Sequence, residues 1–177
     1  MADDGFKQAG FTLIDLLIVC MILGILSMLV APQFHSMNSE RKLISATDEV
    51  ITAIHLSQNL AVQYQRVFYF RAKQTENIIQ VGDLRYKNDP NPHPNDDPPV
   101  LNNGIVLNPL TKIKYDLDFD TLSELEGVNI TSAPAGEYIY FYPDGHSSEA
   151  DSIIVLNYSN QQRTITVDGY TGKTTLN

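Results

Sequence analysis

Asp144, His146 and Ser147 are the residues whose types most resemble a catalytic set, because an acid, a base and a nucleophile stand together. A hydrolase triad needs its base within hydrogen-bond reach of the nucleophile and oriented by a third group. These three residues lie in one tight turn, where adjacent side chains point apart. We therefore interpret them as turn residues, and the sequence predicts no catalytic residue and no enzyme.

Metal binding is a second possible chemistry, and the sequence gives it little support. The other histidines are far apart and show no ligand spacing (His35, His55 and His93). The alternating acids Asp116, Asp118 and Asp120 suggest calcium, but an EF-hand loop needs Gly at its sixth position and Glu at its twelfth. Those positions hold Thr121 and Gly127. We predict no metal and no cofactor.

Asp15 is different, because it lies inside an apolar segment that extends to Pro32. A charged acid in hydrocarbon costs about 3 kcal/mol on insertion scales, so it should have a partner or a task. Residues 11–31 would form about 30 Å of helix, which matches the hydrocarbon thickness of a bilayer. The single cysteine, Cys20, lies in the same segment, so no intrachain disulfide can form.

Three interpretations of this segment are open. A cleaved secretory signal is one, but Asp3 and Asp4 accompany a lone Lys7 where net positive charge is expected. An ordinary single-pass anchor is another, and it does not explain Asp15. The third follows from the residues around Gly10.

The chain reads Gly-Phe-Thr-Leu-Ile-Asp-Leu-Leu over residues 10–17, after a short hydrophilic leader. This pattern resembles the cleavage and methylation signal of type IV pilin-like precursors. The resemblance implies that a prepilin peptidase cuts after Gly10 and methylates the new amino terminus, Phe11. It also implies that Asp15, where the family usually has Glu, neutralises the amino terminus of a neighbouring subunit inside an apolar filament core.

The helix is predicted to continue beyond this segment, to about Arg66. Gly24 and Pro32 stand where the family usually has a helix-weakening glycine and a proline; Gly24 should allow close helix packing, and Pro32 should kink the helix. Apolar residues then recur at helical spacing, with polar residues on the other face. The apolar stripe comprises Leu43, Ala46, Val50, Ile54, Ala61 and Tyr64, and the polar face Asp48, Glu49, Thr52, Gln58 and Gln63.

The rest of the chain reads as a β-rich head. Predicted strands occupy residues 67–70, 78–81, 113–120, 138–142, 153–156 and 164–167. Alternation places Asp116, Asp118 and Asp120 on the wet face of their strand. Residues 87–103 are rich in Pro, Asn and Asp and should form a long exposed loop. The predicted fold class is α+β, a long N-terminal helix packed on an antiparallel sheet or a two-sheet head.

Turn residues near the C-terminus sharpen the resemblance. An Asp-Gly turn follows the strand at 138–142, and a second turn follows the strand at 164–167. The pattern resembles the H-type minor pseudopilins of type II secretion and the related FimT-type minor pilins, whose heads are two packed antiparallel sheets. It is carried by Phe141, Pro143, Asp144, Gly145, Ser147, Ser148, Asp168, Thr171 and Gly172.

Charge limits the partners. From Gln33 onward the chain has 18 Asp and Glu against 11 Lys and Arg, a net charge of about −7. Such a surface repels nucleic-acid phosphates at long range, and we find no local basic patch. Nucleic acid is therefore not an expected partner.

We interpret the chain as a structural minor pseudopilin of a type II secretion pathway, which supports protein export. The main alternative is a FimT-like minor pilin in pilus biogenesis or DNA uptake; a major pilin and a membrane-tethered enzyme are further alternatives. The implied partners are other pseudopilins, the prepilin peptidase and an inner-membrane assembly platform, with the chain crossing the bacterial inner membrane once. The predicted regions are a leader (1–10), a transmembrane and filament-core helix (11–31), an amphipathic continuation (32–66) and a periplasmic head (67–177).

Overall fold

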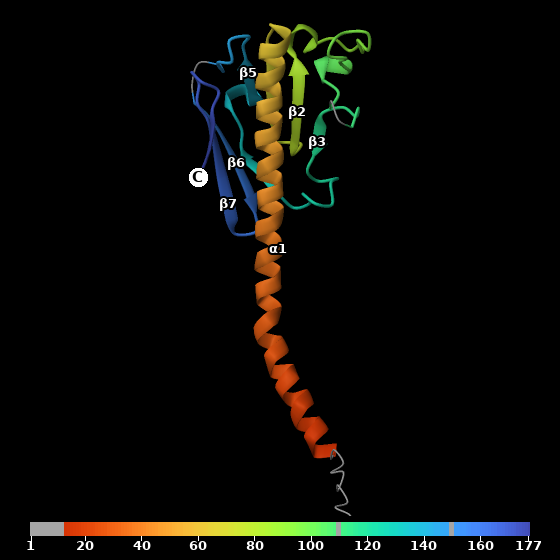
Figure 1. Cartoon of the computed structure of the whole chain (residues 1–177), viewed down its shortest axis with the longest axis vertical. Helices are drawn as coiled ribbons and strands as arrows, with labels where there is room; N and C mark the ends of the chain where they lie inside the picture. Colours follow the sequence, from red (N-terminus) through yellow and green to blue (C-terminus); the bar gives the residue numbers. More distant parts are fainter. Residues whose placement is uncertain (1–12, 109–110, 149–150) are drawn as a thin grey trace, which may run out of the picture. The chain divides into compact units, whose positions relative to one another are not determined.

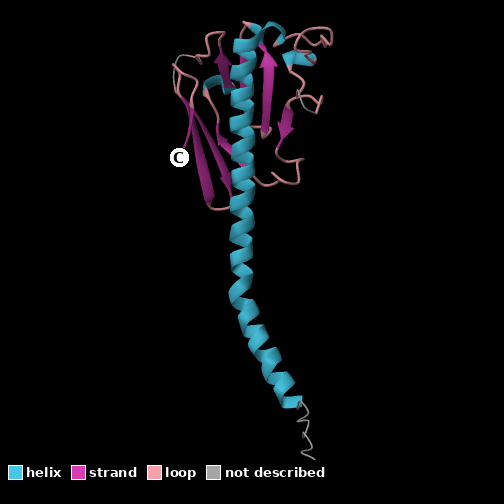
Figure 2. Ribbon diagram, viewed as in Figure 1, coloured by secondary structure: helices cyan, strands magenta, loops and turns pink. Residues whose placement is uncertain are grey.

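The computed structural model describes residues 13–108, 111–148 and 151–177, without the side chains of residues 28–38. The chain divides into two compact units, Met1–Asn38 and Ser39–Asn177, and each is described by itself. Figures 1 and 2 show the helix and the strands. One helix, α1 (Leu13–Tyr64), begins in the first unit and ends in the second.

The first unit presents an uncovered apolar surface. Every described side chain of α1 from Leu13 to Ser27 is exposed, and most of these side chains are large and apolar. Ser27 satisfies its hydroxyl within the helix by donating to the carbonyl of Leu23 at 2.7 Å. No helix in the described part of the chain is both long enough and apolar enough to cross a membrane.

The second unit begins with the amphipathic part of α1. The predicted apolar stripe is confirmed: Leu43, Ala46, Val50, Ile54 and Ala61 are buried, and Tyr64 is half-buried and packs against the core. The helix ends close to the predicted position, at Tyr64. Gln65 has a positive φ of 51°, and the amide of Arg66 donates to the carbonyl of Ala61 at 3.3 Å, which is the Schellman ending of a helix.

Two four-stranded antiparallel sheets complete this unit, which is the two-sheet form of the predicted head. The first has the order β3-β2-β1-β5, and the second has the order β4-β6-β7-β8. Apolar residues of α1 and of both sheets form one hydrophobic core. The strands are β1 (Phe68–Lys73), β2 (Ile78–Asp83), β3 (Asp116–Asp118), β4 (Asn129–Ser132), β5 (Tyr138–Phe141), β6 (Ser152–Tyr158), β7 (Gln161–Val167) and β8 (Thr174–Leu176).

The predicted strand at 113–120 is wrong in its length. Only Asp116–Asp118 forms a strand, and Ile113 is 65% exposed. The physical reason is a turn, because Lys112 has a φ of 59° and the amide of Asn108 donates to the carbonyl of Ile113 at 2.7 Å. The alternation nevertheless buries Tyr115 and Phe119.

Strands β5 and β6 follow each other in sequence and belong to different sheets. The Asp-Gly turn after β5 therefore closes a short return rather than a β5–β6 hairpin: Phe141 bridges Ser147, and the amide of Ser148 donates to the carbonyl of Tyr140 at 2.9 Å. Strands β4 and β8 were not predicted. Both are short edge strands, so they lack the long alternating pattern by which a strand is recognised.

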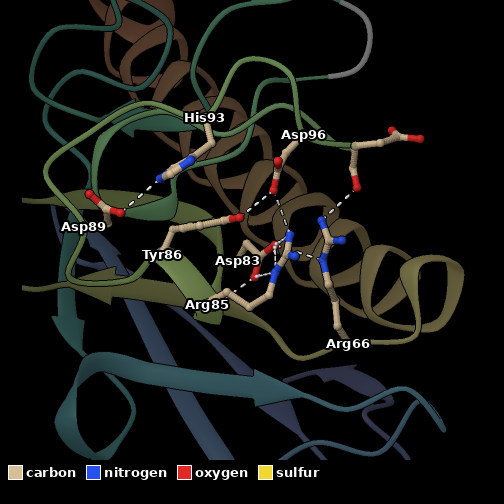
Figure 3. A network of polar contacts seen from close by, with 8 residues as sticks. Arg66, Asp83, Arg85, Tyr86, Asp89, His93 and Asp96 are labelled. Carbon is tan, nitrogen blue, oxygen red and sulfur yellow. Dashed lines mark hydrogen bonds and ion pairs between the residues drawn. The ribbon is translucent and has the colours of Figure 1, made fainter.

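The Pro-, Asn- and Asp-rich loop is held in place by charged residues at its base (Figure 3). Asp83 is fully buried, and its Oδ2 lies 2.9 Å from Nε of Arg66 and 2.9 Å from Nη2 of Arg85. The same guanidinium of Arg85 reaches Oδ2 of Asp96 at 3.1 Å. A buried carboxylate needs such partners, because desolvation penalises an isolated charge by several kcal/mol.

Aromatic rings extend this network into the loop. The hydroxyl of Tyr86 donates to Oδ2 of Asp96 at 2.7 Å, and the Tyr86 ring stacks on His93 with centroids 4.0 Å apart. His93 also contacts Oδ2 of Asp89 at 3.0 Å. The Tyr86 hydrogen bond, with Arg85 nearby, lowers the pKa of Asp96, and the amide of Asn91 with His93 lowers the pKa of Asp89. These contacts tie the loop to the end of β2.

Replacing the buried carboxylate tests this anchoring. Asp83→Asn leaves Arg66 and Arg85 without their shared counter-charge, and both cations are partly exposed, so we expect a loss of about 2 kcal/mol in the free energy of unfolding. Urea denaturation measures it. The control is Glu76→Gln, which breaks an exposed ion pair with Lys73 and should cost less than about 0.5 kcal/mol. Equal stability of the two variants would contradict the anchoring role.

Candidate assembly site

Asp15 lies in the first turn of α1. The side chains beside it are apolar and uncovered, with Ile14, Leu16 and Leu17 exposed by 63%, 64% and 59%. A carboxylate suits this position, because the amino end of a helix carries positive partial charge. Covering the surrounding apolar surface would also desolvate the carboxylate.

The other predicted residues of the N-terminal site are placed only in part. Gly10 and Phe11 lie outside the described residues. Gly24 lies in α1, and a Cβ atom added there would meet nothing within 4 Å. Pro32 falls within the helical range, but its side chain is not among those described, so the kink stays a prediction.

The C-terminal motif forms two neighbouring turns in the second unit. In the first turn the amide of Gly145 donates to the carbonyl of Tyr142 at 2.9 Å, and Gly145 has a φ of 89°. In the second turn Oδ1 of Asp168 accepts from the amide of Thr171 and from its hydroxyl, both at 2.7 Å. The Thr171 bonds lower the pKa of Asp168, so the carboxylate stays ionised and keeps these bonds.

Gln58 of α1 joins the two turns. Its Nε2 donates to the carbonyl of Gly145 at 2.7 Å and to the carbonyl of Thr171 at 3.0 Å. The hydroxyl of Ser147 connects the turns a second time by donating to the carbonyl of Asp168 at 3.1 Å. Gln58 and Ser147 thus connect the two turns of the motif to each other, and Gln58 attaches both turns to the helix.

Gly172 is required by this arrangement. Its φ is 66°, and a Cβ atom there would lie 2.6 Å from Nε2 of Gln58 and 2.9 Å from the carbonyl oxygen of Gly145. Real Cβ atoms do not approach a backbone oxygen so closely, and L-residues rarely adopt this φ. Gly172, which has no Cβ atom, thus lets the two turns approach Gln58.

The hydrolase-like residues do not form a triad. Nδ1 of His146 contacts Oδ1 of Asp144, and the imidazole stacks on Tyr142 with centroids 4.3 Å apart. Ser147 instead donates its hydroxyl to Asp168, as described above. The His146 hydrogen bond lowers the pKa of Asp144. The arrangement stabilises a turn.

The carboxylates of Asp116, Asp118 and Asp120 each accept a hydrogen bond from a different donor. Oδ1 of Asp116 accepts from Gln80 at 3.2 Å, and Oδ1 of Asp118 accepts from the amide of Asp120 at 2.9 Å. Oδ1 of Asp120 accepts from Asn77 at 2.8 Å. Among the described residues, no three His, Cys, Asp or Glu side chains gather as metal ligands.

Gln58 is the residue that sequence reasoning placed wrongly. It was assigned to the solvent face of the helix, whereas it is half-buried between the two turns. A signal was present, because position 58 lies four residues after Ile54 and three before Ala61, on the buried stripe. A polar residue there indicates a hydrogen-bond partner in the head.

Removing the Gln58 amide tests the attachment of the turns. Gln58→Ala loses two hydrogen bonds and leaves two carbonyls without this donor, so we expect a loss of about 2 kcal/mol in unfolding free energy. Gln63→Ala is the matched control, because Gln63 is exposed on the same helix and should change stability by less than about 0.5 kcal/mol. Chemical denaturation of both variants decides, and an unchanged Gln58→Ala protein would refute the attachment.

Comparisons with known proteins identify the N-terminal segment and the fold. Residues 5–31 match the prokaryotic N-terminal methylation motif. No curated protein matches the chain. The type IV minor pilin FimU of Pseudomonas aeruginosa is similar in structure, with a TM-score of 0.50 and 13% identity, over 80% of this chain and 92% of FimU. The minor pseudopilin EpsH of the Type 2 Secretion System of Vibrio cholerae gives a TM-score of 0.42 and 14% identity, over 77% of this chain and 96% of EpsH.

The likeness to FimU concerns the fold, a helix packed on antiparallel sheets, and the motif concerns the segment around Gly10. They agree with the resemblance found in the sequence, and the prediction of the fold class is confirmed. The chain carries a prokaryotic N-terminal methylation motif at residues 5–31 and has a fold similar to that of FimU.

Proposed function

We propose that this protein is a structural subunit of a pilin-like filament. The favoured candidate is a minor pseudopilin of a type II secretion system. The observation that carries the proposal is the methylation motif at residues 5–31, which runs directly into the uncovered apolar part of α1. Such a surface needs lipid or other helices around it. The membrane supplies lipid around this surface before assembly, and a filament of like subunits supplies neighbouring helices afterwards.

The proposed chemistry of assembly uses Asp15. Cleavage after Gly10 makes Phe11 the first residue and Asp15 the fifth. The carboxylate of one subunit then pairs with the amino terminus of its neighbour. In an apolar filament core this pairing is strong, because opposite charges attract more at low dielectric and an unpaired carboxylate is costly there.

The remaining elements of the proposal follow from this role. Residues 11–31 cross the inner membrane before assembly, and the head lies in the periplasm. Gly24 allows close approach of neighbouring helices, as small residues do in membrane helix packing. The partners are the prepilin peptidase, the assembly platform and neighbouring pilins, and the protein has no catalytic role.

A minor pilin of a type IV pilus is the second candidate. The fold likeness to FimU supports it, since FimU is a type IV minor pilin. The C-terminal motif from Phe141 to Gly172 resembles both H-type minor pseudopilins and FimT-type minor pilins, so it supports either candidate over a major pilin. The net charge of about −7 from Gln33 onward weighs against DNA uptake.

Processing provides the first test. Gly10→Leu should block cleavage, because the resemblance places the scissile bond after this glycine. When the chain is co-expressed with a prepilin peptidase, the wild type should show the faster gel mobility of a shortened chain. The variant should keep the mobility of the precursor. Cleavage of the variant at the wild-type rate would contradict this assignment.

Incorporation into filaments provides the second test. Asp15→Ala should leave cleavage largely intact and reduce incorporation about tenfold or more, because a buried charge pair is lost. Asp48→Ala is the control, since it removes an exposed acid of the same helix in the other unit. The measurement is a pull-down of the processed chain with its neighbouring subunits. Normal recovery of Asp15→Ala would remove the argument for the carboxylate.

A further inference from the structure

His93 lies in the Pro-, Asn- and Asp-rich loop, between two side chains that hold its ring (Figure 3). The imidazole stacks on Tyr86 with an interplanar angle of 22°, and its Nε2 lies 3.0 Å from Oδ2 of Asp89. The backbone of His93 pairs with Val100: the amide of His93 donates to the carbonyl of Val100 at 2.8 Å, and the amide of Val100 donates back at 3.2 Å. The ring therefore sits at the point where the two arms of the loop meet.

The charge of His93 decides how strong its side-chain contacts are. Histidine is the side chain that ordinarily changes its charge between pH 5 and 8. A neutral imidazole makes an uncharged hydrogen-bond donor to Asp89, whereas an imidazolium makes an ion pair, and charge-assisted hydrogen bonds are about twice as strong. A cation is also attracted to the face of an aromatic ring, which is Tyr86 here. Both contacts strengthen when His93 gains a proton.

Asp89 keeps its negative charge over the same pH range. The amide of Asn91 donates to its Oδ1 at 2.9 Å, and this bond, together with the contact to His93, lowers the pKa of Asp89. An ordinary aspartate already has a pKa near 4. Between pH 5 and 8, His93 is thus the partner of this pair that changes its charge.

The other charged groups of the network also favour a proton on His93. Arg66 and Arg85 are its cations, and both pair with Asp83, while Arg85 also reaches Asp96. The acids outnumber these two arginines: Asp83, Asp89, Asp96 and Asp97. The neighbouring cation Lys87 is engaged with β5, where its Nζ donates to the hydroxyl of Tyr140 at 2.6 Å. With a neutral imidazole the network is therefore negative, and a proton on His93 reduces that excess.

Two other described histidines lack this combination. His55 is exposed on α1, and its Nε2 lies 3.0 Å from the hydroxyl of Thr174, which supplies no counter-charge. His146 contacts Asp144 and stacks on Tyr142, but these residues belong to one tight turn. His93 differs because its side-chain contacts and its pairing with Val100 close a loop.

We propose that His93, Tyr86 and Asp89 form a pH-sensitive latch, which we call the histidine latch. In acid, the imidazolium pairs with Asp89 and holds the His93–Val100 pairing closed; as the pH rises and the proton leaves, this hold weakens. The inference goes beyond the proposed function, because it concerns the head alone and needs neither cleavage nor a filament. It makes the conformation of a surface loop depend on the acidity around it.

Hydrogen exchange at the Val100 amide measures the closing of the loop. The full-length chain in detergent is compared at pH 5.5 and pH 7.5, and the rates are corrected for the intrinsic pH dependence of amide exchange. The added ion pair exists only with protonated His93, so protection should be higher at pH 5.5. We expect a difference of about threefold, as a partly exposed ion pair provides.

Three variants assign the difference to the latch. His93→Gln keeps a polar side chain that does not titrate, so its protection should be equal at the two pH values. Asp89→Asn removes the counter-charge and should reduce the difference to less than about 1.5-fold. His55→Gln is the matched control and should keep the threefold difference, because His55 contacts only a hydroxyl. His93 and Asp89 are both partly exposed, so these variants should fold, and circular dichroism checks this.

The proposal is overturned if the wild-type protection is the same at both pH values, or if either loop variant keeps the wild-type difference. Loss of the difference in His55→Gln would also overturn it, because another histidine would then be responsible. The measurement needs no prepilin peptidase and no neighbouring subunit, so none of these outcomes affects the proposed function.

Discussion

The apolar side chains of α1 from Leu13 to Leu26 set the constraint on which the function depends. Their exposure ranges from 46% at Val19 to 82% at Leu13, and each square ångström of such surface costs about 25 cal/mol in water. Under the proposed function, lipid and then neighbouring helices cover this segment. The proposal gives Asp15 a role in that step, because opposite charges attract more strongly at low dielectric. In the proposed filament, the amino terminus of a neighbouring subunit is the cation that pairs with this carboxylate.

In the second unit, the apolar side chains of the same helix are buried instead of exposed. Small and branched side chains from Leu43 to Ala61 join both sheets in one core, so the head is built directly on the helix. Gln58 adds a polar attachment near the end of that stripe, where it holds the two C-terminal turns. The motif that resembles minor pseudopilins thus has a structural explanation: its glycines and its Asp168 allow two turns to meet one amide of the helix.

Local patterns made much of this fold predictable. The stripe at helical spacing identified the buried face of α1, and the β-rich segments identified six of the strands. Contacts between distant residues could not be found in this way. Gln58 meets Gly145 and Thr171, which lie 87 and 113 positions away. The buried Asp83 likewise pairs with Arg66, just after the end of α1, and Arg85 links this pair to Asp96 in the loop; composition indicated an exposed loop but not these contacts.

The mass of the mature protein tests the central claim most directly. Intact-mass analysis of the chain from cells that contain a prepilin peptidase should show loss of residues 1–10 and the gain of one methyl group on Phe11. Asp15 would then be the fifth residue, within reach of the chemistry described. A mature chain that keeps Met1, or one that starts after Pro32, would contradict the account, because no cleaved apolar helix would remain to pair its acid with a neighbouring amine.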